Sequence, residues 1–450
     1  GRRRLQRRST RVGRTTVYRR NKVLDDLVTI EWDADARLSG LVSGQNVTSL
    51  TLNEISLKKS SNKSQGIALQ LKGMMQTENY EYVAPDWMVG IDALPTDSAF
   101  TDGKLWGLRN TGQSRGMAGI DVQAVEAWDI TTGSNEVIVA VIDTGVRYTH
   151  NDLAANMWKN PGEVAGNGRD DDGNGFVDDV HGINAIRNSG DPNDDHGHGT
   201  HVAGTIGAVA NGGGAAVGVA WNAKIMALKF ISAGNEGWGS DEIQCIDYAI
   251  ANGANVINAS YGGGGYSRSV VNAINRARSA GIVFVAAAGN DGSNNDHDHH
   301  YPSDYTMDNI ISVAAINRNG NLATYANTGF WGSNYGRTSV DLAAPGVSIY
   351  STYNRSDTDY ESLQGTSMAA PHVSGVAALV LSREPNLTPA EVRIRLIATA
   401  LPLNSLKRKV VSGGMVDALA ALQEASTPSL SLDVSHQPQD PVQGKLGVEA

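Results

Sequence analysis

The sequence predicts a doubly wound α/β fold, in which a mainly parallel sheet is covered by helices on both faces. Short runs of apolar and β-branched residues alternate with longer amphipathic segments along most of the chain. Several of these runs are continuously apolar, as expected for strands buried on both sides. Gly contributes 51 of the 450 residues, which indicates many tight turns. Sites in such a fold gather at the carboxyl ends of the strands.

Six apolar runs are the predicted strands, and they cover residues 137–143, 224–231, 255–261, 282–290, 310–316 and 340–346. Between them, residues 241–253 and 269–281 have the periodicity of amphipathic helices. The single cysteine, Cys245, lies in the first of these helices, where we expect a small buried apolar residue. One cysteine also excludes a disulfide within the chain.

The composition divides the chain into four zones: a basic arm expected to be disordered (1–22), a small α+β unit (23–95), the main α/β body (103–424) and a tail expected to be disordered (425–450). The small unit contains predicted strands in LVTIEWD and NYEYVAP and a predicted helix near IALQLKGMM. The tail is rich in Ser, Pro and Gln.

The charge is divided unevenly between the arm and the rest of the chain. The first 20 residues carry nine arginines and no acid, whereas the remainder has 28 basic and 47 acidic residues. The acidic body argues against nucleic acid as the main partner. The arm itself is either a protease-sensitive leader or a segment that binds nucleic acid or an anionic membrane. We expect no transmembrane segment, since no run of 18 apolar residues occurs.

Three segments place candidate catalytic groups where strands end or helices begin. Asp143 closes the apolar strand VIVAVID, and His198 begins a predicted helix in HGTHVAG. Ser367 follows Gly365 at the start of a strongly apolar helix, with Pro371 in its first turn. A serine becomes a nucleophile when an imidazole takes its proton, and the imidazole needs a carboxylate to orient it. Asp143, His198 and Ser367 can fill these three roles.

The cluster of His196, His198 and His201 permits a second interpretation. His198 and His201 on one helix face, together with Asp195, could bind zinc. A zinc site would leave Ser367 and the strand-end Asp143 unexplained, so we favour the serine interpretation.

The segments VIDTGV, HGTHVAGT, AAAGN and GTSMAAPHVSG are together similar to the four signature segments of the subtilisin-like serine proteases, or subtilases. The resemblance covers residues 103–424. It implies a serine endopeptidase in which Asp143 orients the base His198, Ser367 is the nucleophile and Asn290 belongs to the oxyanion hole. It also implies that His201 is a packing residue, and we place His196 at the rim.

The resemblance further implies that an extended peptide substrate pairs with two strand edges. The matching residues are Ser260, Tyr261 and Gly262 in one segment and Ala287, Ala288 and Gly289 in the other. In the family, the residue before a Tyr-Pro pair lines the pocket between these segments, and here it is His300. One hypothesis is a polar pocket whose preference depends on pH. The alternatives are a loop that folds outward, and a surface metal site formed by residues 297–299.

The sequence also predicts bound Ca²⁺. Asp170, Asp172 and Asn174 form a DxDxNG pattern with Gly175, in which alternate oxygen ligands precede a tight turn. Further carboxylates are available from Asp178 and Asp179, and the alternative is an acidic surface loop without an ion.

A second calcium site is implied by the resemblance alone. It would use Asp152 and Asn211, with an N-terminal ligand that the sequence does not locate.

The resemblance gives residues 23–95 the position and size of a subtilase pro-domain, which would chaperone folding and then act as an intramolecular inhibitor. Self-cleavage is expected between about residues 85 and 103. We expect a secreted or secretory-pathway monomer, whose targeting segment is not visible in this chain. Two alternatives remain: a catalytically silent fold that binds peptides, and a protein whose basic arm is its functional part. The sedolisins are disfavoured, because they replace the histidine by glutamate and the oxyanion asparagine by aspartate.

Overall fold

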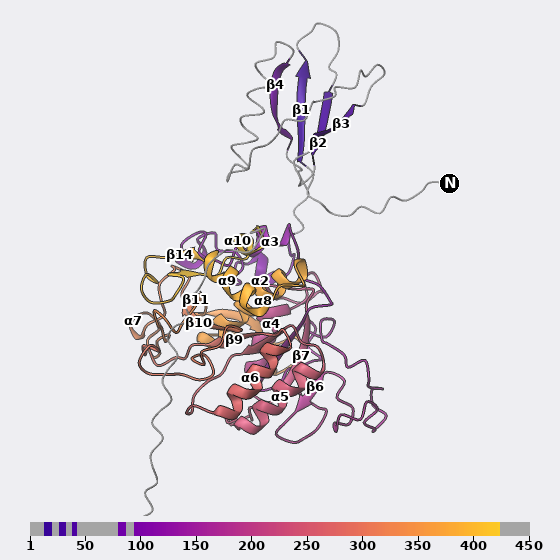
Figure 1. Ribbon diagram of the computed structural model, residues 1–450, viewed down its shortest axis with the longest axis vertical. Coiled ribbons are helices and arrows are strands. Elements are labelled where there is room, and N and C mark those ends of the chain that lie inside the picture. The colour runs from indigo at the N-terminus through magenta and orange to yellow at the C-terminus, as the bar shows by residue number, and fades with distance from the viewer. Residues whose placement is uncertain (1–12, 20–26, 33–37, 43–79, 87–93, 424–450) are drawn as a thin grey trace, which may run out of the picture. The chain divides into compact units, whose positions relative to one another are not determined.

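The computed structural model describes residues 13–19, 27–32, 38–42, 80–86 and 94–423 (Figure 1). The chain divides into two compact units, residues 1–93 and 94–450, and each is described by itself. The predicted tail and the helix predicted near IALQLKGMM lie outside the described residues.

The first unit contains a four-stranded antiparallel sheet in the order β3-β2-β1-β4. Its strands are β1 (Gly13–Arg19), β2 (Leu27–Trp32), β3 (Leu38–Val42) and β4 (Tyr80–Asp86). The strands predicted in this zone are present as β2 and β4. The predicted boundary of the arm at residue 22 is wrong, because β1 lies inside it and pairs on both sides. Two threonines, a valine and a tyrosine favour a strand here, despite the surrounding arginines.

The second unit is built on a nine-stranded sheet in the order β14-β15-β11-β10-β9-β8-β5-β7-β6. Every neighbouring pair is parallel except β14 with β15. The strands are β5 (Ile138–Asp143), β6 (Gly182–Asn184), β7 (Lys224–Lys229), β8 (Val256–Ala259), β9 (Val283–Ala287), β10 (Ile310–Ile316), β11 (Leu342–Pro345), β14 (Leu401–Pro402) and β15 (Gly414–Met415). The predicted doubly wound α/β fold and its six strands are confirmed.

The described residues of the second unit, 94–423, contain nine α-helices: α2 (Ser98–Thr101), α3 (Ala124–Trp128), α4 (His198–Gly207), α5 (Gly239–Ala251), α6 (Arg268–Ser279), α7 (Tyr325–Thr328), α8 (Thr366–Arg383), α9 (Pro389–Ala398) and α10 (Ala418–Gln423). A short hairpin joins β12 (Ile349–Thr352) to β13 (Tyr360–Leu363). None of the helices in the described part of the chain combines the length and apolarity needed to cross a bilayer.

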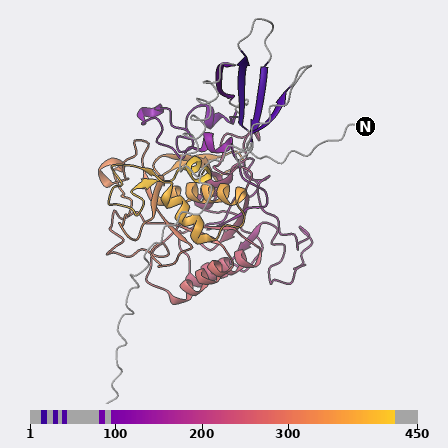
Figure 2. The same cartoon turned by 45° about the horizontal axis from the view of Figure 1, so that its top comes forward.

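Alternation along the strands separates the apolar core into two layers. In β5, Val139 and Val141 belong to the core that contains α4 and α8, whereas Ala140 and Ile142 belong to the core that contains α5 and α6. The two groups of helices therefore cover opposite faces of the sheet. Cys245 on α5 is completely buried, as predicted, and α5 lies beside α6 in both views (Figures 1 and 2).

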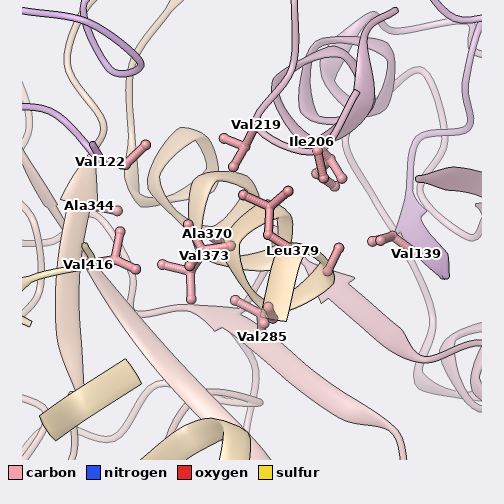
Figure 3. Close-up of a cluster of buried hydrophobic side chains, with 14 of the residues drawn as sticks. Val122, Val139, Ile206, Val219, Val285, Ala344, Ala370, Val373, Leu379 and Val416 are labelled. Atoms are coloured by element: carbon pink, nitrogen blue, oxygen red, sulfur yellow. The ribbon is translucent and has the colours of Figure 1, made fainter. Parts of the chain in front are cut away.

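Helix α8 runs through the middle of the first layer. Ala370, Val373 and Leu379 contribute to a cluster that also contains Val139 and Val285 from the sheet (Figure 3). Almost every side chain of α8 is buried, which explains why the helix is apolar on all sides. Its first turn is thereby fixed at the edge where the parallel strands end.

Candidate active site

The end of β5 and the start of α4 bring Asp143 and His198 together. Asp143 is the last residue of β5 and is fully buried, and His198 is the first residue of α4. Nδ1 of His198 lies 2.8 Å from Oδ1 of Asp143. A carboxylate only accepts, so Nδ1 carries the proton and Nε2 is free to act as a base. Glycine is required at position 199, because a Cβ there would lie 2.1 Å from the carbonyl oxygen of Gly145.

Opposing effects act on the pKa of His198. Burial disfavours the charged imidazolium and lowers the pKa, whereas the charge and hydrogen bond of Asp143 and the charge of Asp194 raise it. The two carboxylates outweigh burial, and the pKa lies above its ordinary value of 6.5. His198 is consequently a stronger base than a free histidine.

Ser367 is the second residue of α8 and is half-buried. The helix begins after Gly365, whose φ of 148° is readily adopted only by glycine. The N-cap residue Gly365 offers no side-chain acceptor, and of the first N–H groups of α8 that of Thr366 bonds to Asn290. The first backbone N–H groups and the helix dipole therefore favour negative charge beside Ser367.

The sequence placed Pro371 in the first turn of the helix, but it lies in the second turn of α8. Because proline has no N–H, the carbonyl of Ser367, four residues earlier, receives no helical hydrogen bond. That carbonyl accepts the hydroxyl of Ser260 at 2.8 Å instead. Because Pro371 lacks an N–H, the carbonyl of Ser367 is free to bond to Ser260, which belongs to one of the predicted substrate segments.

The side chain of Asn290 and the backbone nitrogen of Ser367 lie close to each other beside Gly365. Thr366 donates to Oδ1 of Asn290 from its backbone N–H at 2.9 Å and from its hydroxyl at 3.1 Å. With the oxygen engaged in this way, the amide presents its NH₂ group on the other side. A Cβ built on Gly365 would lie 3.6 Å from Nδ2 of Asn290 and 3.7 Å from the nitrogen of Ser367. Two donors at this spacing can share one oxyanion.

The predicted substrate segments follow β8 and β9, whose parallel pairing ends at Ala259 and Ala286. Ser260–Gly262 continues from β8, and Ala287–Gly289 continues from the end of β9. The imidazole of His300 lies between them, since a Cβ on Gly262 would be 1.9 Å from its Cε1 and a Cβ on Gly289 would be 2.8 Å from its Cδ2. The alternative that this loop folds outward is therefore wrong.

A buried carboxylate anchors the His300 loop. The side chain of Asp304 is 1% exposed, and it accepts the backbone N–H of His300 at 2.8 Å. It also accepts the amide of Asn295, which donates in turn to the carbonyl of Ala288. Burial raises the pKa of Asp304 to about 6, against the hydrogen bonds that lower it. Burial also lowers the pKa of His300, while the charge of Asp291 raises it.

The other histidines of HGHGTH do not form a zinc site. His201 is fully buried, and its Nε2 donates to the carbonyl of Ile349. Burial lowers the pKa of His201 to about 3, so it is a neutral packing residue. The half-buried His196 lies with its ring centroid 6.3 Å from that of His198. Within the described residues, the group of three or more His, Cys, Asp or Glu side chains close enough to share an ion is Glu163, Asp172 and Asp179, and none of the histidines or residues 297–299 belongs to it.

The acidic loop brings together only part of the predicted calcium set. Oxygens of Asp172 and Asp179 lie within 4.8 Å of each other and of an oxygen of Glu163, which the sequence analysis missed. Oε2 of Glu163 and Oδ1 of Asp179 are buried without a hydrogen-bond partner. The amide of Asn174 donates to both aspartates. Unpartnered carboxylate oxygens around one point suit a hard cation such as Ca²⁺.

Asp170 and Asp178 have a different role. Asp170 accepts the backbone N–H groups of residues 173–175, and Asp178 accepts those of residues 166–168. Both carboxylates close turns of the loop instead of joining the group of three. The alternation of ligands predicted for this loop stays a prediction for Asp170 and Asp178, whose oxygens already take part in turn formation.

The residues assigned to the second site are also close together. Oδ2 of Asp152 accepts three hydrogen bonds, whereas its Oδ1 is buried without a partner. The backbone N–H of Asn211 donates to Asp97, and Oδ1 of Asn211 accepts from Thr96. Burial raises the pKa of Asp97, and the charge of Asp152 adds to the effect. Asp97 is thus a candidate for the N-terminal ligand that the sequence did not locate.

Three further residues support the site and were missed. Asp194 and Thr366 are buried polar residues that bond to the turns carrying His198 and Asn290. Thr366 lies inside the segment GTSMAAPHVSG and Asp194 lies four residues before HGTHVAGT, so an inspection of the polar residues in and near these segments could have found them. Glu163 lies seven residues before Asp170 in a loop of irregular spacing, and no sequence signal identifies it.

Comparisons with known proteins agree with this arrangement. A sequence model described as the subtilase family matches residues 134–423. The chain is 38% identical over 328 residues to Subtilisin-like protease 1 of Plasmodium vivax, covering 68% of this chain and 51% of that protein. It is 37% identical over 376 residues to the Extracellular protease of Xanthomonas campestris, covering 77% of this chain and 60% of that protein.

A solved structure of a protease from Pseudoalteromonas arctica has a TM-score of 0.54 and 36% sequence identity. The match covers 73% of this chain and 98% of that one. The chain spans about half the length of the Plasmodium relatives that it matches.

Proposed function

The chain belongs to the subtilase family, and we propose that it is a serine endopeptidase that cleaves peptide bonds through Ser367, His198 and Asp143. The observation that carries this proposal is the 2.8 Å hydrogen bond from His198 Nδ1 to the buried Asp143. It leaves Nε2 of a strengthened base free at the edge of the sheet where α8 presents Ser367.

In the proposed reaction, Nε2 of His198 takes the proton of Ser367 Oγ while that oxygen attacks the carbonyl carbon of the substrate. The side-chain amide of Asn290 and the backbone N–H of Ser367 stabilise the oxyanion. His198 then gives its proton to the leaving nitrogen, and the C–N bond breaks to leave an ester on Ser367. Water, deprotonated by His198, hydrolyses the ester and restores the serine.

We also propose that the protein is made as a zymogen, with residues 23–95 as its pro-domain. Residues from Leu94 onward belong to the second unit, in which Phe100 is buried and Asp97 bonds to Asn211. Cleavage on the N-terminal side of Leu94 would leave these contacts intact. This narrows the expected region of processing, residues 85–103, to its first half.

Calcium is proposed as a stabilising ion. Glu163, Asp172 and Asp179 would hold it, with Asp152 and Asp97 as candidates for a second site. The bound ion would neutralise carboxylates that otherwise repel one another, and we give it no part in the chemical step. Secretion is proposed because the similar Xanthomonas protein is an extracellular protease, and a monomer remains our expectation.

His300 is proposed to shorten the pocket for the residue before the scissile bond. Its ring occupies the space between Gly262 and Gly289, so short or polar side chains should be preferred there. Peptides with Ala, Asn, Leu or Phe at this position test the proposal in wild type and in His300→Gly. The variant should gain activity on Leu and Phe, and identical preferences would contradict the assignment. Any dependence of the preference on pH should fall below pH 6.5, because burial lowers the pKa of His300.

The intact mass of wild type and Ser367→Ala, purified with calcium, tests the function. We expect the wild type to lose about 90 residues, the basic arm and the pro-domain together, and the variant to remain whole. Loss of the same segment from both proteins would attribute the cut to another protease. An intact wild type that cleaves no peptide library would favour the alternative of a silent peptide-binding fold.

A further inference from the structure

A second buried carboxylate lies behind the pair formed by His198 and Asp143. Asp194 is 4% exposed, and its two oxygens accept five hydrogen bonds. The donors to Oδ1 are the hydroxyl of Thr144 and the backbone N–H groups of His196 and Gly197, each at 2.9 Å, and the donors to Oδ2 are the backbone N–H and the hydroxyl of Thr200, at 3.0 and 2.6 Å. The residues bonded to Asp194 therefore flank His198 on both sides.

Thr144 connects this carboxylate to the end of β5. Its backbone N–H donates to Oδ1 of Asp143 at 2.7 Å, and its hydroxyl accepts the backbone N–H of Gly199 at 2.9 Å. The same hydroxyl donates to Asp194. The hydroxyl of Thr144 thus bonds directly to Gly199, the residue after His198. Through the carboxylate of Asp194 it is also linked to the turn before His198.

The charge of Asp194 also acts on the imidazole. It raises the pKa of His198 in addition to the larger effect of Asp143. The other titratable groups around His198 are His196, on the preceding loop, and the buried neutral His201 on α4. The charges that raise the pKa of His198 are those of Asp143 and Asp194. A buried cation, Lys229 on β7, donates to the carbonyl of Thr144 and to Asp195.

We propose that Asp194 is a positioning residue for the general base: it holds the turn that carries His198 against the end of β5, and its charge stabilises the imidazolium formed during the reaction. This inference rests on the proposed function. Asp143 fixes the tautomer of the His198 ring. Asp194 fixes the position of the backbone that carries the ring.

Two pairs of variants separate position from charge. Asp194→Asn removes the charge, and Asp195→Asn is its matched control, because Asp195 is the next residue, is 43% exposed and pairs with Lys229. Thr144→Val removes the linking hydroxyl while Asp194 stays ionised, and Thr144→Ser restores the hydroxyl. Thermal unfolding of each processed protein establishes that it is folded.

The readouts are kcat and KM on one peptide as a function of pH. In Asp194→Asn, the acid limb of kcat/KM should move to lower pH, because loss of a negative charge disfavours the imidazolium. Thr144→Val should lower kcat by up to about 10²-fold, as expected for a misplaced catalytic group, and leave the acid limb in place. Thr144→Ser and Asp195→Asn should resemble the wild type.

A folded Asp194→Asn with the acid limb of the wild type would overturn the electrostatic part of the proposal. Wild-type kcat in Thr144→Val would overturn the positional part, and this variant decides that part if Asp194→Asn does not fold. Failure of the proposed function would be recognised separately, as peptide hydrolysis in the wild type that is absent or survives Ser367→Ala.

Discussion

The side-chain amide of Asn290 offers the most direct test of the proposed oxyanion hole. Replacement by aspartate keeps Oδ1, which accepts two hydrogen bonds from Thr366, and exchanges only the NH₂ group for an oxygen. Asn290 is exposed, so the change removes no packing from the core. The loss should therefore appear in the transition state and not in the stability of the fold.

The expected loss is on the order of 10²–10³ in kcat, or about 2.7–4 kcal/mol, with KM little changed. This magnitude is the one known for the oxyanion asparagine of subtilisin, itself a member of the family. Asn290→Ala should lose a similar amount, since it removes the same donor without adding a charge. Asn290→Asp should unfold at the temperature of the wild type, whereas Asn290→Ala also removes the acceptor of two hydrogen bonds from Thr366 and should unfold at a lower temperature.

The assay is steady-state hydrolysis of one peptide, with active sites titrated so that kcat refers to competent enzyme. A loss below tenfold in both variants would refute the assignment of Asn290 to the oxyanion hole. A rise in KM at constant kcat would also refute it, because that pattern indicates uniform binding of substrate and transition state.

Three further outcomes are expected. Ca²⁺ at 100 times its Kd should stabilise the fold by about 2.7 kcal/mol. In thermal unfolding, Asp172→Asn should abolish this gain. The control Asp171→Asn should retain it, because Asp171 is an exposed neighbour outside the group of three carboxylates. Burial raises the pKa of Glu242 from 4.5 to about 7, despite the hydrogen bond from Tyr261. Between these pH values the folded state binds more protons than the unfolded state. The free energy of unfolding should therefore fall by about 3 kcal/mol as the pH rises from 4.5 to about 7. Urea unfolding of Glu242→Gln should lack this decline, and an unchanged pH dependence would contradict the assignment. Thr366→Val should lower kcat about tenfold by loosening Asn290, and Thr366→Ser should not; equal kcat values for the two would show that the hydroxyl is not needed.

The sequence predicted the architecture of the second unit and the approach of Asp143 to His198, because both depend on local patterns. Continuous apolar strands can be recognised without knowledge of their neighbours, and strand ends identify where side chains will meet. Asp143, at the end of β5, and His198, at the start of α4, are therefore brought together as predicted.

The remaining features depend on contacts that no local pattern encodes. In the acidic loop, the DxDxNG pattern predicted Asp170 and Asp172 as ligands, whereas the carboxylates that cluster in the structure are those of Glu163, Asp172 and Asp179. Asp170 accepts backbone N–H groups of its own loop. The strand formed by Gly13–Arg19 was hidden by its arginines, since composition alone does not reveal pairing with distant strands. The direction of His300 depended on Asp304, whose role becomes visible only when the loop is closed.

Pro371 gives the nucleophile's helix an unusual property. Elsewhere in a helix each carbonyl is satisfied by the same segment of chain, but the carbonyl of Ser367 depends on the hydroxyl of Ser260, 107 residues away in the sequence. A peptide that pulls on the segment of Ser260 would therefore also pull on the backbone of Ser367. Under the proposed function, binding of a peptide to the segment of Ser260 and the position of Ser367 would therefore be coupled, so that a well-fitting peptide would itself adjust the attacking oxygen.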